Sequence, residues 1–270
     1  MSLDLSSVEA KMGRAADHLN ALKDQVGSWR KRDVYALVSH VNPQNTVFSF
    51  TLNILNEPPL QDWSLIIGDC ISNLRCALDH LIYAIAVHES NTSPPPNEDA
   101  LMFPICDGPT AFGKKGVQDR IKTLSLPVRT AIEAMQPYKR PHPSLPPLLS
   151  ILRDFDNTNK HKLLRLAFAT VGQGEFNISV DPIPGAKRNF HTRIRYAEMK
   201  QDTEVFSVTC DRPTPDMNCK VRIDFMIALW HGKRDASTPP WGDRTEFSPL
   251  LRMLGDEVAF VIDTVASSVS

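Results

Sequence analysis

The stretch SNLRCALDHL at positions 72–81 holds three side chains that could do chemistry within one helical segment. An arginine such as Arg75 can bind an anion, and a histidine such as His80 can transfer a proton near neutral pH. Asp79 lies four positions after Arg75, a spacing at which the two side chains of a helix meet. The segment therefore predicts either an ion pair that satisfies buried charges or part of an anion-binding acid/base site.

A stripe of polar residues runs along the same segment. At 3.6 residues per turn, Asp69, Asn73, Cys76 and His80 fall within roughly 60° of one another, whereas Arg75 lies about 140° from His80. Polar residues this close together can satisfy one another inside a core, and they can equally line a cleft. If the residues line a cleft, His80 serves as the acid/base and Arg75 as an anion clamp, whose guanidinium comes near the imidazole only because the arginine side chain is long.

A second polar cluster occurs in RDFDNTNKHKLL, at positions 153–164. Its candidate substrate-binding residues are Asn157, Lys160 and His161, which gather on the polar side of a predicted helix and could donate to a phosphate. A charged outer face is the other explanation of the pattern. If the two helices pack side by side, we expect Arg75, His80, Lys160 and His161 to share one cleft.

The spacing Arg75-x4-His80 on a long bundle helix resembles the R-x4–6-H motif of the HEPN superfamily. That superfamily includes metal-independent RNases of toxin–antitoxin and other defence systems, together with non-catalytic members. The resemblance implies a catalytic set of Arg75, His80, Asn73 and Asp79, and no cofactor.

The resemblance also implies a definite reaction. His80 would assist attack of a ribose 2′-hydroxyl on the adjacent phosphate or protonate the leaving oxygen, and Arg75 would stabilise the charge of the transition state. RNA would be the substrate. A homodimer is implied as well, with the two motifs facing one composite cleft.

Two other functions remain open. One is a metal-dependent enzyme, since His18, His80 and His161 lie on three predicted helices and Asp69 or Asp156 could complete a site. The other is a non-catalytic intracellular binding or regulatory protein. The second is consistent with the sequence, in which no P-loop, G-x-G-x-x-G, G-x-S-x-G or H-E-x-x-H motif occurs.

Composition bounds these functions. With 270 residues, 42% of them hydrophobic, the chain can bury a sizeable core. A formal net charge of −1 provides no overall attraction to nucleic acid or anionic membrane. The five cysteines lack metal-finger spacing and fit free thiols in a reducing compartment. With no signal-peptide pattern, we expect a cytoplasmic protein without a membrane anchor.

The hydrophobic periodicity predicts that most of the helices precede most of the strands along the chain. Helices are expected at 5–26, 61–89, 145–164 and 247–269, with short helical segments at 112–124 and 128–135. A β-hairpin is expected from DVYALVSHV and TVFSFTLNI, because NPQN between them has turn chemistry. Residues 163–171, 175–180, 190–197, 203–210 and 219–230 have strand-like composition.

The fold class expected from these elements is α+β, a helical bundle packed with an antiparallel β-sheet in the C-terminal half. We expect a mainly helical region at 1–165, which includes the N-terminal hairpin, and a region at 166–270 with the sheet and the last helix. The two regions would form one compact unit.

Overall fold

The structure is a computed structural model that describes residues 3–140, 147–180, 189–194, 199–230 and 244–269. It has helices and antiparallel strands, so the expected α+β class is confirmed. The chain forms two compact units, which we call the helical unit (residues 1–23, 61–164 and 248–270) and the strand unit (24–60 and 165–247). This division differs from the expected boundary at 165, because the N-terminal hairpin joins the later strands and the last helix joins the earlier helices.

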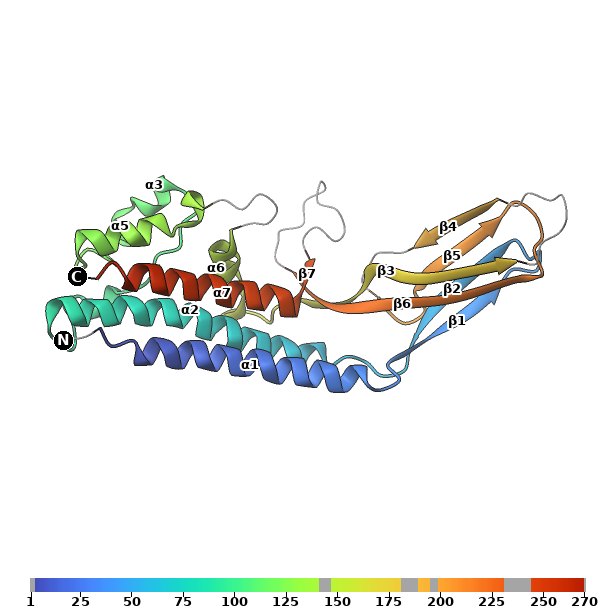
Figure 1. The fold of residues 1–270 in the computed structure, drawn as a ribbon, viewed down its shortest axis with the longest axis horizontal. Helices are drawn as coiled ribbons and strands as arrows, with labels where there is room; N and C mark the ends of the chain where they lie inside the picture. The colour runs from blue at the N-terminus through green and yellow to red at the C-terminus, as the bar shows by residue number, and fades with distance from the viewer. Residues whose placement is uncertain (1–2, 141–146, 181–188, 195–198, 231–243, 270) are drawn as a thin grey trace. The chain divides into compact units, whose positions relative to one another are not determined.

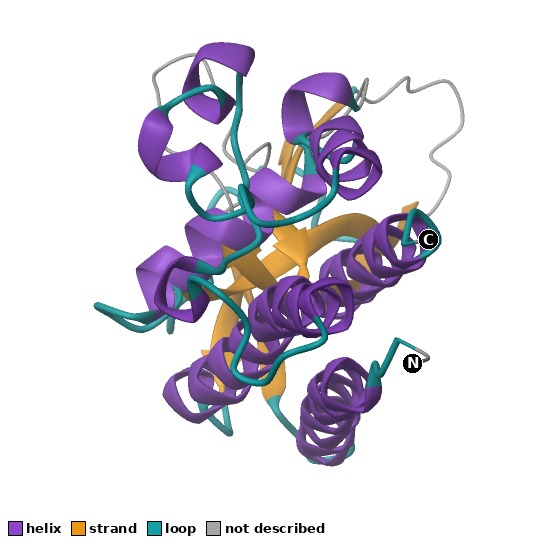
Figure 2. Ribbon diagram, turned by 90° about the vertical axis from the view of Figure 1, so that its left-hand side faces the viewer, coloured by secondary structure: helices purple, strands orange, loops and turns teal. Residues whose placement is uncertain are grey.

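The helical unit is built on three long helices that lie side by side (Figure 1). They are α1 (Ser6–Arg30), α2 (Leu60–Ser90) and α7 (Phe247–Ala266). Figure 2 shows them from the end of the unit at which both chain termini lie. The shorter elements are η1 (Glu98–Ala100), α3 (Pro109–Phe112), α4 (Lys115–Gln118), α5 (Leu126–Ala134), η2 (Pro137–Lys139) and α6 (Leu148–Asn159).

Two expected helices differ in extent. The segment 112–124 contains the short helix α4 rather than a continuous helix, because Gly113 and Gly116 weaken helix formation there. The helix expected at 145–164 is α6, which ends at Asn159; residues 145 and 146 lie outside the described residues.

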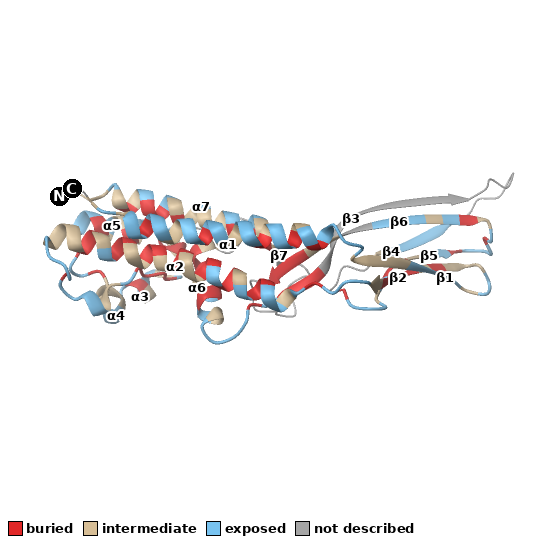
Figure 3. Cartoon of the chain, turned by 90° about the horizontal axis from the view of Figure 1, so that it is seen from below, coloured by how far each residue is buried: buried red, intermediate tan, exposed pale blue. Residues whose placement is uncertain are grey.

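Helix α2 is the centre of the helical unit. Its buried residues cover most of its circumference, and Trp63, Ile71 and Leu78 are each no more than 1% exposed. Figure 3 shows buried positions recurring along each long helix, with exposed positions between them. Burying a large apolar side chain contributes about 1.5–3 kcal/mol, so this core provides the main stabilisation of the bundle.

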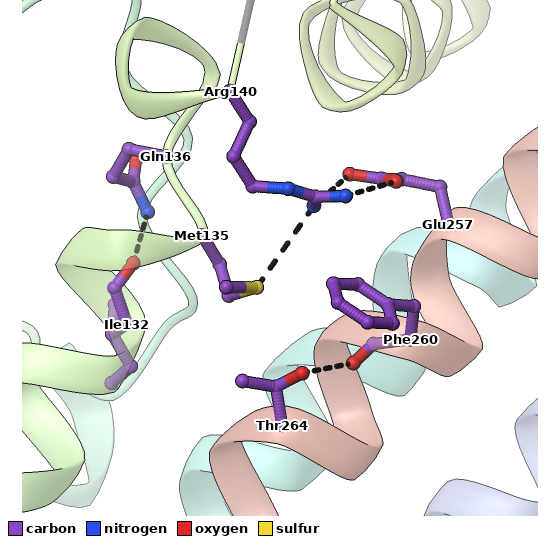
Figure 4. Close-up of polar contacts among 7 residues, drawn as sticks. All are labelled: Ile132, Met135, Gln136, Arg140, Glu257, Phe260 and Thr264. Carbon is purple, nitrogen blue, oxygen red and sulfur yellow. Dashed lines mark hydrogen bonds and ion pairs between the residues drawn. The ribbon is translucent and has the colours of Figure 1, made fainter.

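Helix α7 is also tied to the segment that follows α5. The Arg140 guanidinium donates to both carboxylate oxygens of Glu257, at 2.6 and 3.1 Å (Figure 4). The same guanidinium lies over the ring of Phe260, 4.7 Å from its centroid. A bidentate pair with a cation–π contact fixes the position of the Arg140 side chain against the helix.

The strand unit has two antiparallel sheets. One sheet has the order β1-β2-β5-β4 and the other β3-β6-β7. The bounds are β1 (Tyr35–Val41), β2 (Val47–Ile54), β3 (Leu166–Val180), β4 (Phe190–Ile194), β5 (Glu204–Cys210), β6 (Met217–Trp230) and β7 (Arg244–Glu246).

Most of the expected strands form, but they lie in two sheets instead of one, and β7 was not expected. Residues 195–197 of the strand expected at 190–197 lie outside the described residues. The hairpin expected at the N-terminal side is β1 paired with β2, and the Asn42 carboxamide oxygen in its turn accepts from the N–H groups of Thr46 and Val47. The two strands expected at 163–171 and 175–180 are the single strand β3. The glycines between them produce a register shift against β6 rather than a turn.

Candidate functional site

Arg75 and Asp79 together hold the main chain of Phe103. The Arg75 Nη2 donates to the Phe103 carbonyl oxygen at 2.8 Å, and the Phe103 N–H donates to the Asp79 Oδ1 at 2.9 Å. The two side chains also form an ion pair, with Nη1 2.8 Å from Oδ1. The Arg75 side chain is only 11% exposed, so its guanidinium is used inside the unit.

The segment 101–106, to which Phe103 belongs, has no regular secondary structure and yet is largely buried. The Gln136 amide, which is fully buried, accepts from the Cys106 N–H at 2.9 Å and donates to the Pro104 carbonyl at 2.9 Å. Arg153 from α6 extends to the Ile105 carbonyl at 3.5 Å. Side chains from three parts of the fold thus satisfy backbone groups that would otherwise be unpaired in the core.

A group of four charged residues connects the two motifs found in the sequence. Burial raises the pKa of the Asp79 carboxyl above its ordinary value of 3.8, and the nearby Asp156 carboxylate acts in the same direction. The Arg75 guanidinium and the Phe103 N–H oppose that rise. Asp156 is itself buried and pairs with the Lys160 ammonium at 2.6 Å. Each carboxylate therefore has one basic partner, and the four charges sum to zero.

His80 lies on another face of α2, as the wheel geometry predicts. Its side chain is partly exposed, and no hydrogen bond or ion pair within the described part of the chain involves it. Asn73, on the same face, donates to the Asp69 carbonyl oxygen of its own helix at 2.8 Å. The polar stripe of α2 is thus the side of the helix that the rest of the unit covers least.

The second cluster contacts α2 through a residue that the sequence does not single out. Asn159, at the end of α6, donates to the Ser72 Oγ at 3.3 Å. A Cβ added at Gly68 would lie 2.7 Å from the Asn159 Cγ, so the absence of a side chain at Gly68 makes room for this amide. Gly68 is twelve positions before His80, or about 18 Å along a helix.

The structure places the residues that we expected to share one cleft in different surroundings. Arg75 is buried against Phe103, Lys160 is paired with Asp156, and His161 is an exposed residue that follows α6. Asn157 is exposed as well. Arg75 is therefore not part of an exposed cleft, and it is through Asp79 and Asp156 that its ion pair lies near that of Lys160.

Cys70 and Cys106 of the helical unit are buried thiols, whereas Cys76 is partly exposed. Burial raises the pKa of Cys70 to about 12, and its Sγ lies 3.4 Å from the Ala15 carbonyl oxygen of α1. Burial also raises the pKa of Cys106. Thiols with raised pKa carry little thiolate at neutral pH and are poor nucleophiles.

The alternative metal site is not assembled in the described part of the chain. No group of three or more histidine, cysteine, aspartate or glutamate side chains lies there in a geometry that could hold a metal ion. His18, His80 and His161 accordingly do not converge with Asp69 or Asp156.

Among the described helices, α2 is long and apolar enough to span a bilayer by length and composition. In its most apolar window, 56% of the residues are buried within the structure. A core helix of a soluble protein passes the same test, so this property is weak evidence for a membrane span.

The most informative residues that the sequence analysis missed are Gln136 and Phe103. Nothing in the pattern around Gln136 distinguishes it from a surface glutamine, and its partners are about 30 positions away.

No protein-family model, curated protein or solved structure that we compared with this chain matches it.

Proposed function

We propose that this chain is a non-catalytic, cytoplasmic binding protein that works as a homodimer paired through α2. The non-catalytic role is supported by the hydrogen bonds that Arg75 and Asp79 make to the main chain of Phe103. An arginine held by a carbonyl oxygen and a carboxylate in a buried site would have to leave both before it could bind a phosphate. The R-x4-H spacing then has a structural explanation that does not require catalysis.

The surface for a second copy is the α2 stripe, which we define as Ile66, Asp69, Asn73, Cys76, His80 and Tyr83. These residues are exposed or partly exposed, and the interval between them alternates between four and three positions. That spacing is typical of a seam along which two helices pack. A second α2 could therefore lie along this seam.

The stripe is complementary to itself when two copies run antiparallel about a twofold axis. In such a pair, two residues face each other when they lie equally far from the axis on opposite sides of it. Asp69 and His80 share their midpoint along α2 with Asn73 and Cys76, so Asp69 faces His80 of the second copy and Asn73 faces Cys76. A twofold axis makes each contact twice. The Asp69–His80 pairs would favour this register, since opposite charges or a charge-assisted hydrogen bond would form at both ends.

Covalent trapping tests the dimer. In an Asn73→Cys variant, the new thiol should form a disulfide with Cys76 of the second copy under mild oxidation with oxidised glutathione, and non-reducing electrophoresis should show a covalent dimer. Asn20→Cys, on an exposed position of α1, is the matched control and should stay monomeric. Equal cross-linking of the two variants would overturn the proposed pairing.

A charge exchange gives an independent test. Asp69→His alone should weaken the dimer measured by sedimentation velocity, because histidine would then face His80. The double variant Asp69→His, His80→Asp should restore it, since each copy again presents an opposite pair. A double variant as weak as the single one would contradict the register.

The RNase remains the second candidate, and one observation favours it. His80 is partly exposed and has no partner within the described residues, so its ring is available for proton transfer. Incubation of RNA with the protein in EDTA distinguishes the two functions. We expect no cleavage by the wild type; cleavage that His80→Ala abolishes would overturn the non-catalytic proposal.

A further inference from the structure

A pocket of about 450 Å³ lies between the first turn of α1 and the last turns of α2. Its lining includes Asp4, Ser7, Tyr83, Val87, His88 and Asn91, all of which belong to the helical unit. The volume is within the range of small-molecule sites in proteins. The residues of the RNase motif and of the Phe103 contact are not among those that line it.

His88 provides an unsatisfied polar atom at this pocket. His88 is among the lining residues, and its ring Nδ1 is buried without a hydrogen-bond partner in the described part of the chain. Leaving a buried polar atom without a partner costs on the order of 1–3 kcal/mol. The nitrogen has almost no accessible surface, so a ligand reaches it only when the His88 ring turns toward the pocket, and a hydrogen bond made there would recover that cost.

The charges around the pocket favour a cation. Asp4 supplies a carboxylate, and neither lysine nor arginine is among the lining residues. The Asp4 Oδ1 accepts from the Ser6 N–H at 2.9 Å, which lowers the pKa of the carboxyl and keeps it ionised at neutral pH. The pocket also adjoins the C-terminal end of α2, where the helix dipole is negative.

The remaining lining favours an apolar body on that cation. The Tyr83 side chain is part of the wall and is 39% exposed, so a ring or methyl group can lie against it. Ala84 and Val87 add aliphatic surface beside it. A tyrosine ring also attracts an ammonium group over its face.

We propose that this pocket binds a small organic amine with an apolar body. The ammonium pairs with Asp4, the apolar part lies against Tyr83 and Val87, and the ligand hydrogen-bonds to the His88 ring. This site rests on the proposed binding role and gives that role a ligand class. The pocket shares Tyr83 with the end of the α2 stripe, and the central residues of the stripe, from Asp69 to His80, are not among its lining residues.

Three probes of one size test the assignment. Benzylamine, benzyl alcohol and benzoate are titrated into the full chain at constant pH and ionic strength, and binding is followed by calorimetry and by the NMR signals of the His88 ring. We expect saturable binding of benzylamine, weaker binding of the alcohol and none of benzoate. Alcohol binding as tight as amine binding, or tighter binding of benzoate, would overturn the proposal.

Variants locate the site. Asp4→Asn retains an oxygen that can accept from the Ser6 N–H, so the helix start is preserved while the charge is lost. It should weaken benzylamine binding by about two- to fivefold, the usual contribution of one exposed ion pair. Asp17→Asn, on an exposed position of α1, is the matched control and should bind like the wild type. Unchanged binding in Asp4→Asn would refute the role of the carboxylate.

The two proposals fail in different ways. If benzylamine does not bind while the chain still cross-links through Asn73→Cys and leaves RNA intact, the amine site is refuted and the binding role stands. If His80→Ala abolishes an RNA cleavage that the wild type performs, the binding role is refuted whatever the amine titration shows.

Discussion

Replacement of Arg75 by methionine tests whether this arginine stabilises the fold. Methionine preserves much of the aliphatic packing and removes the guanidinium. The Phe103 carbonyl would lose its donor, at a cost of about 1–3 kcal/mol for a buried acceptor. Asp79 would lose its counter-ion; because its side chain is 31% exposed, we discount the cost of a fully buried orphaned charge to about 1–2 kcal/mol.

The expected loss in the free energy of unfolding is therefore about 2–5 kcal/mol. Urea unfolding followed by helical circular dichroism measures it, since most of the helical residues belong to the unit that contains Arg75. Asp17→Asn, at an exposed position of α1 outside the α2 stripe, is the control and should change stability by no more than about 0.5 kcal/mol.

A double-mutant cycle with Asp79→Asn isolates the contact between the two side chains. The double variant should cost at least about 1 kcal/mol less than the sum of the single variants, because the second change no longer leaves a charge unpaired. If Arg75→Met unfolds at the same urea concentration as the wild type, the reasoning is refuted, and the arginine would be free for another role.

Three further outcomes are expected from the same contacts. Gln136→Leu should lower the free energy of unfolding by about 2–5 kcal/mol, because the Cys106 N–H and the Pro104 carbonyl lose their partner; a loss below about 1 kcal/mol would contradict this. Gly68→Ala should lower the melting temperature and cost about 1–3 kcal/mol, because the new Cβ would overlap the Asn159 amide, and a second change, Asn159→Ala, should restore stability. In the control Gly13→Ala the new Cβ meets nothing within 4 Å, so this variant should be more stable than the wild type. Because the pKa of Asp79 is raised in the folded protein, its protonated form stabilises the fold. This contribution is complete below the pKa of the unfolded chain and is lost as the pH rises through the folded pKa. The stability of Asp79→Asn relative to the wild type should therefore rise from acid to neutral pH. Unfolding of both proteins at each pH measures this, and a growing advantage of the wild type would mean that pairing with Arg75 outweighs burial.

Local sequence patterns predict which segments are helices and strands over most of the described chain. The spacing of apolar residues at 61–89 predicts α2 nearly to its ends, and the turn residues before Val47 predict the β1–β2 hairpin. The same spacing predicts that Arg75 faces away from His80 and can pair with Asp79. These properties depend on residues within a few positions of one another, so a local pattern is enough.

The partners of the polar residues, in contrast, depend on how distant segments pack. Arg75 meets a carbonyl 28 positions away, Gln136 meets groups 30 and 32 positions away, and Asn159 lies against Gly68. Local periodicity places a side chain on a face of a helix but does not say which distant segment covers that face. It therefore left open whether Arg75 binds a ligand or the chain itself, and the packing of segment 101–106 against α2 supplied the backbone groups that it binds.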